Sequence, residues 1–148
     1  MTPDKAATAN ANAYATVALK PEDCNRILLA ALEAGDIDTS VNLYELGAVL
    51  FAKSGETMSG HEAIRANNAA LIALRPRFLI EEIIVTLSGD STIATTRMKA
   101  DMHGTRPDGK PVQGAIHTLE VLRRQADGSW CYVIDDPFGS MRGAMPAR

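Results

Sequence analysis

The stretch that decides the fold runs from Val112 to Phe138 and reads VQGAIHTLEVLRR, QADGS and WCYVIDDPF. Two β-prone runs, Val112–Arg124 and Trp130–Phe138, flank the turn sequence Asp127-Gly128. A short Asp-Gly turn between two such runs is typical of a β-hairpin. The stretch therefore predicts the last antiparallel pair of a sheet.

Upstream of this hairpin the chain first adds strands and then changes to helices. Two further β-prone runs, Phe78–Ser88 and Ser91–His103, are joined by a tight polar turn. Before them come a helical pattern opened by Pro21, a short one over Ile37–Leu43, and a third that Pro76 ends. Helices that precede a run of antiparallel hairpins predict an α+β fold, not an alternating parallel one.

Composition narrows the classes of function. The chain has 148 residues and a net charge of −3, which suits one globular domain and gives no clustered basic face for nucleic acid. No apolar run approaches the ~20 residues of a membrane span. Cys24 and Cys131 have no metal-ligand spacing and are interpreted as free thiols of a reducing compartment, which predicts a cytoplasmic protein without a bound metal.

We expect residues 21–139 to form the domain. Residues 1–20 are rich in Ala, Thr and Asn, and residues 140–148 follow the last strand, so both are predicted as flexible tails. Gly-rich phosphate loops are absent, and no cofactor is expected.

Three motifs in this order resemble the nuclear transport factor 2-like superfamily. They are LEAGDI at Leu32–Ile37, SGHEAI at Ser59–Ile64, and RQADGSW at Arg124–Trp130, which continues into VIDDPFG at Val133–Gly139. The loop Gly104–Pro111 is similar to the SnoaL-like, ketosteroid-isomerase-like subgroup. The resemblance implies a cone-shaped fold with N-terminal helices packed on a strongly curved, mainly antiparallel sheet around a pocket. It also implies a homodimer that pairs through the outer sheet face.

The resemblance does not fix a reaction, because the same scaffold carries isomerases, cyclases, dehydratases, hydrolases and binding modules. Matched to ketosteroid isomerase, this chain has Leu28 at the position of the catalytic Tyr and Ala52 at that of the base, and the second Asp falls near His117. Ketosteroid isomerisation by that mechanism is therefore not expected.

The hairpin supplies its own candidate site. Pairing through Asp127-Gly128 sets Leu119 opposite Asp136. The strand face with the larger apolar groups is predicted to face the helices, and it carries His117 and Asp136 together. An imidazole beside a carboxylate could act as a general acid or base, so these two residues are the predicted catalytic pair. The alternative is a structural pair that closes the rim of the core. Predicted ligand contacts are Leu28, Met98, Leu119, Trp130, Tyr132, Ile134 and Phe138.

The opposite face of the hairpin is predicted to form the homodimer. It carries Ile116, Leu122, Cys131 and Val133, which are too apolar for a solvated surface. The sequence thus predicts a domain that binds a small apolar molecule, with proton-transfer chemistry of isomerase or cyclase type as one hypothesis. A non-catalytic ligand-binding or homodimerisation module of the same fold is the alternative.

Overall fold

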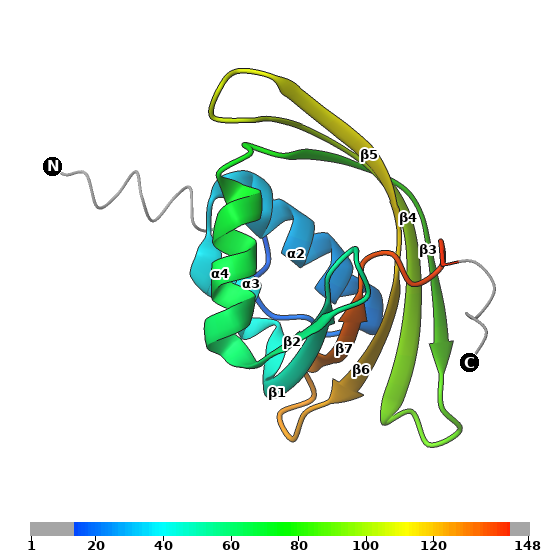
Figure 1. Ribbon diagram of the computed structural model, residues 1–148. Helices are drawn as coiled ribbons and strands as arrows, with labels where there is room; N and C mark the ends of the chain where they lie inside the picture. Colours follow the sequence, from blue (N-terminus) through cyan, green and yellow to red (C-terminus); the bar gives the residue numbers. More distant parts are fainter. Residues whose placement is uncertain (1–13, 143–148) are drawn as a thin grey trace, which may run out of the picture.

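The computed structural model describes residues 14–142 and confirms the α+β class. In this part of the chain three helices pack on a seven-stranded, mostly antiparallel sheet that is curled but not closed (Figure 1). The elements are α2 (Pro21–Ala34), α3 (Ile37–Asn42), β1 (Tyr44–Phe51), β2 (Thr57–Ser59), α4 (Gly60–Ile72), β3 (Arg77–Leu87), β4 (Ile93–Thr105), β5 (Pro111–His117), β6 (Leu119–Arg124) and β7 (Trp130–Asp136).

The sheet has the order β2-β1-β7-β6-β4-β3, and β5 pairs with β4. Only the β1–β7 pair is parallel among these described strands. The long strands β3 and β4 curve around the helices, which lie inside the bend (Figure 1). This curvature leaves space between helices and sheet at one end of the molecule.

The run predicted as one strand, Val112–Arg124, is two strands separated at Thr118. The first part, β5, pairs with the C-terminal half of β4, and the second part, β6, pairs with the N-terminal half of β4. Thr118 keeps both of its polar groups paired at the break, because its N–H donates to the Met98 carbonyl at 2.9 Å and its Oγ1 accepts the Met98 N–H at 2.8 Å. The break therefore costs no backbone hydrogen bond at this point.

The first two helices begin and end within a residue of their predicted bounds, whereas α4 ends at Ile72, four residues before Pro76. Pro21 opens α2, and Glu22 and Asp23 lie in its positive first turn. Gly35 ends it in a left-handed conformation with φ 73°. Asp36 then caps α3 by accepting the Thr39 N–H at 3.2 Å.

A β-bulge in the last hairpin corrects the predicted faces. Leu119 pairs with Asp136 as expected, but the register shifts after Val121, so that Leu122 lies opposite Tyr132. The extra residue is Val133 on β7, and a bulge of this kind reverses the alternation of its strand beyond the inserted residue. Because the inward Tyr132 pairs with Leu122, the inward face of β6 carries Glu120 and Leu122, and the prediction that Leu119 faces inward is wrong.

Burial shows the same correction across the hairpin. Leu119 and Ile134 are 40% and 38% exposed on the outer face. Leu122, predicted to lie in an outer dimer surface, is buried in the core, and Ile116, predicted beside it, packs against the core on the inner face. On β6 the outer face therefore carries Leu119 and Val121 in place of Glu120 and Leu122.

The ends of the described chain are packed against the sheet. The Ala18 carbonyl accepts the Trp130 N–H at 2.9 Å, and Ser140 Oγ donates to the Thr118 carbonyl at 2.6 Å. The rest of the two predicted tails, residues 1–13 and 143–148, lies outside the described residues. Within residues 14–142 no helix is long and apolar enough to cross a membrane.

Candidate functional site

A cavity of about 370 Å³ lies between the helices and the concave face of the sheet. Helices α2 and α4 and most of the strands line it, together with the residues that follow β7. The volume lies within the ~300–1,000 Å³ typical of small-molecule sites. Its wall is mainly apolar, with a few polar groups concentrated on β6, β7 and α4.

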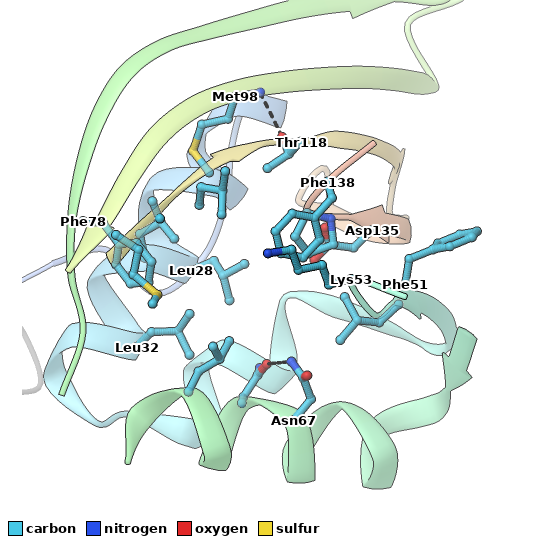
Figure 2. Close-up of a pocket in the computed structure, with 18 of the residues that line it drawn as sticks. Leu28, Leu32, Phe51, Lys53, Asn67, Phe78, Met98, Thr118, Asp135 and Phe138 are labelled. Carbon is cyan, nitrogen blue, oxygen red and sulfur yellow. Dashed lines mark hydrogen bonds between the residues drawn. The ribbon is translucent and has the colours of Figure 1, made fainter. Parts of the chain in front are cut away.

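The two ends of the cavity differ in polarity (Figure 2). Leu32 and Phe78 lie at one end, with only apolar side chains labelled beside them. At the other end Lys53, Asp135 and Phe138 come together, and the Lys53 ammonium lies over the Phe138 ring at 5.8 Å from its centroid. The cavity is thus suited to an elongated molecule with one polar end.

Two carboxyl groups face each other across β6 and β7 in the cavity wall. Glu120 and Asp135 are paired in register, and both line the cavity. Glu120 is 1% exposed and Asp135 is 4% exposed. Like charges directly opposite on neighbouring strands destabilise a sheet, so this arrangement favours a proton on one of the two groups.

The hydrogen bonds of Glu120 show which oxygen would carry a proton. Oε1 accepts from Asn25 Nδ2 at 2.6 Å and from Thr96 Oγ1 at 3.2 Å. Oε2 is buried and has no partner among the described residues. Because Oε1 already accepts two donors, the proton of a neutral Glu120 belongs on Oε2, which would then be a donor without an acceptor.

Burial raises the pKa of Glu120 to about 8, and the charge of Asp135 adds to the rise. Contacts with Thr118, Asn25 and Thr96 act in the opposite direction. This raised pKa favours the neutral form of Glu120 at pH 7.

Asp135 is the more acidic member of the pair. Burial raises its pKa to about 6, a hydrogen bond from Tyr44 opposes that rise, and the charge of Asp136 adds to it. The Tyr44 hydroxyl donates to Oδ2 at 2.5 Å. At neutral pH the site therefore combines an ionised carboxylate with a neutral carboxylic acid, an arrangement that suits a base and an acid acting together.

The predicted ligand contacts fall into two groups. Leu28, Met98, Tyr132 and Phe138 line the cavity. Trp130 is buried in the core but does not line the cavity. Leu119 and Ile134 lie on the outer face of the sheet.

The structure does not bring His117 and Asp136 into a hydrogen-bonded pair among the described residues, and neither lines the cavity. Asp136 instead accepts two hydrogen bonds from Arg142, from Nε at 2.8 Å and from Nη2 at 2.9 Å. Arg142 also donates to the carbonyl groups of Ala52 and Lys53. Asp136 thus holds Arg142 against the residues that follow β1, while a catalytic role for His117 and Asp136 stays a prediction.

Glu120 and Asp135 were missed because strict alternation placed them outside. The sequence left both assignments of β6 open. Thr118, Glu120 and Leu122 alternate with Leu119 and Val121, so each face of the strand carries at least one apolar residue. Only the bulge decides between the two faces.

Within residues 14–142 no cluster of three or more His, Cys, Asp or Glu side chains could hold a metal ion.

A curled α+β sheet that encloses an apolar cavity with a few buried polar groups defines a class of small-molecule-binding domains. The model of the SnoaL-like domain family matches residues 26–133. The chain therefore belongs to the SnoaL-like domain family.

Solved structures support the same fold. A proposed aromatic ring hydroxylase from Novosphingobium aromaticivorans is 20% identical, with a TM-score of 0.69 over 78% of this chain and 82% of that one. A ketosteroid isomerase-like protein from Erwinia carotovora atroseptica is 19% identical, with a TM-score of 0.65 over 78% and 89%. A proposed dehydratase of the NTF2-like family from Streptomyces avermitilis is 18% identical, with a TM-score of 0.64 over 76% and 88%. No curated protein matches the sequence significantly.

Proposed function

We propose that the cavity binds a small, mostly apolar carbonyl compound and that Asp135 and Glu120 transfer protons on it. The observation that carries this proposal is the pair of buried carboxyl groups of Glu120 and Asp135, which lie in register among the residues that line the cavity. Glu120 Oε2 has no hydrogen-bond partner among the described residues. An unpaired buried polar atom costs roughly 1–3 kcal/mol, and a ligand oxygen that accepts its proton would remove that cost. Buried acids with shifted pKa values in a pocket are typical of catalytic groups.

The chemistry follows from the two protonation states. The Asp135 carboxylate takes a proton from the carbon next to the substrate carbonyl, and the C–H electron pair forms a carbon–carbon double bond. The carbonyl oxygen meanwhile takes the Glu120 proton, which gives an enol. If the substrate has a double bond between its β and γ carbons, the product of this step is a dienol. Asp135 then gives its proton to the γ carbon while the enol O–H returns its proton to Glu120, which completes an isomerisation and restores both groups.

This chain lacks the Tyr and the Asp base that the resemblance to ketosteroid isomerase would supply. Leu28 and Ala52, which stand at the positions of its Tyr and its base, both line the cavity with apolar groups. Acid–base chemistry in this chain therefore has to come from other strands, and Glu120 and Asp135 are the carboxyl groups in the cavity wall.

The test is deuterium uptake by 2-octanone in D2O, followed by proton NMR. We expect exchange at its α carbons above the buffer rate with the wild-type protein, and its loss in Glu120→Gln and Asp135→Asn. Glu82→Gln, which changes an exposed carboxyl on β3, is the matched control and should leave exchange unchanged.

Binding of 2-octanone without exchange would contradict proton transfer and support the alternative, a non-catalytic binding module. The binding itself is measured by calorimetry on the same variants. Exchange that survives in both carboxyl variants would mean that other groups carry it, and His117→Ala then becomes the next variant to test.

We also propose a homodimer through the outer face of the sheet. The exposed or half-exposed residues Ile84, Leu119, Val121 and Ile134 lie there on three strands, and such a surface favours a self-complementary contact. Sedimentation velocity at micromolar concentration should give a dimer for the wild type and a monomer for Ile134→Lys. A wild-type monomer contradicts the proposal.

The free thiols Cys24 and Cys131 support a proposed cytoplasmic location.

A further inference from the structure

We infer that Lys53 selects ligands with a carboxylate group, so that the substrate is an elongated apolar carbonyl compound that also carries a carboxylate, bound with its charged end at Lys53 and its chain toward Phe78. This inference rests on the proposed binding of a small molecule in the cavity. It adds to that proposal the charge and the orientation of the ligand.

The charge of Lys53 is uncompensated among the described residues. The cavity wall contains one basic side chain, Lys53, and its amine forms no ion pair with a carboxylate of residues 14–142. Its neighbour at the same end, Arg142, is held by Asp136 and does not offer a free charge. The amine points toward Phe138 and the cavity (Figure 2).

The opposite end of the cavity offers only apolar contacts. Leu32, Met102 and Phe78 line it, and Leu71 of α4 closes the same side. A hydrocarbon chain placed there would bury apolar area at about 25 cal/mol per Å². The polar and apolar ends together fix the direction in which an amphipathic molecule enters.

The surroundings favour a single negative charge. The ionised Asp135 at the same end repels anions, so a dianion such as a phosphate monoester is disfavoured. The helix that lines this side, α4, contributes Asn67 and Asn68 from its middle and not its positive N-terminus. One ammonium group suits a single carboxylate. Asn67, elsewhere in the cavity wall, donates through Nδ2 to Asn68 Oδ1 at 3.2 Å and keeps a second N–H for a ligand.

An ammonium ligand is the competing chemistry, because Glu120 and Asp135 are both acids without a cation within ion-pair distance in the described chain. Two features argue against it. Glu120 is neutral at pH 7, and Lys53 repels a cation at the polar end. The order of affinity should therefore be carboxylate, then neutral amide, then amine.

The experiment measures binding of three eight-carbon molecules, octanoate, octanamide and octylamine, to the full chain by isothermal titration calorimetry at pH 7. We expect octanoate to bind about three- to tenfold more tightly than octanamide, which is the range of a partly exposed ion pair. Lys53→Met keeps the length of the side chain and should remove that preference. Lys110→Met, at an exposed loop lysine outside the cavity, should preserve it.

The outcomes separate the two proposals. Octanamide that binds as well as octanoate, or a preference for octylamine, overturns the carboxylate inference but leaves small-molecule binding in place. A preference for octanoate that survives Lys53→Met overturns the role of Lys53. Absence of binding by all three molecules overturns the inference together with the proposed binding function.

Discussion

Replacement of Glu120 by Gln should abolish a specific dependence of stability on pH. A carboxyl group whose pKa rises from 4.5 in the unfolded chain to about 8 in the folded protein binds a proton on folding between those pH values. The folded state then holds more protons than the unfolded state, so the free energy of unfolding falls as pH rises. The fall is complete above the folded pKa.

The magnitude follows from the same pKa values. Each unit of pH within the window lowers the free energy of unfolding by about 1.4 kcal/mol. Asp135, with a pKa raised from 3.8 to about 6, acts in the same direction but only at lower pH. Between pH 6.5 and 8 the fall therefore comes mostly from Glu120 and should reach about 1.5–2 kcal/mol.

Urea denaturation followed by the fluorescence of Trp130, at intervals from pH 5 to 8, measures this dependence. Glu120→Gln keeps an acceptor for Asn25 and Thr96 and cannot ionise, so its stability should be nearly flat above pH 6.5. Glu82→Gln, at an exposed carboxyl, should retain the wild-type slope. Equal slopes in the wild type and Glu120→Gln would refute the buried neutral acid and, with it, the assignment of acid and base.

Two further variants test the surroundings of the site. Tyr44→Phe removes the donor to Asp135 and should cost about 1–3 kcal/mol at pH 7.5, with a smaller loss at pH 5, where Asp135 is protonated; equal losses in urea denaturation at both pH values would contradict this origin. Gly139→Ala places a Cβ at 2.6 Å from the Leu119 Cβ, which should cost about 1–3 kcal/mol of stability. Gly89→Ala meets nothing within 4 Å and should change stability by less than about 0.5 kcal/mol in the same assay, so a similar loss in both glycine variants would argue against close packing at residue 139.

The fold was predictable because its signals are local. Pro21, Gly35 and Asp36 mark helix ends through backbone conformation and capping, which depend on a few neighbouring residues. The Asp127-Gly128 turn likewise predicted the last hairpin, but the pairs next to the turn, such as Arg124 with Trp130, are offset by one residue from the expected register. The expected pairing of Leu119 with Asp136 holds only beyond the bulge. Four of the predicted ligand contacts, Leu28, Met98, Tyr132 and Phe138, line the cavity, and their contact with a ligand stays a prediction.

The candidate site was harder to predict because it depends on one inserted residue. Both faces of β6 carry apolar groups, so hydrophobicity alone does not distinguish the face of Leu119 from that of Leu122. The register shift after Val121 settles the choice, and it brings Leu122 and Tyr132 together in the core. No residue type in the sequence predicts such a bulge, because the stability of the bulged strand depends on the packing of the whole curved sheet.

The same bulge explains why the acids lie where they do. Without it, a residue at position 135 would share a face with residues 131 and 133, and Tyr132 would not share the inner face with Asp135. With it, Tyr132 and Asp135 both face inward, one beside Asn25 and the other beside Tyr44. The insertion thus assembles a neutral acid, a carboxylate and two tyrosines at one end of an otherwise apolar cavity. Removing Val133, the extra residue between Tyr132 and Ile134, should therefore abolish the site while leaving the hairpin sequence able to pair. A deletion within the exposed loop of residues 106–110, between β4 and β5, should leave the site intact. Proton exchange on 2-octanone that survives the Val133 deletion in a folded protein would contradict this account of how the site is built.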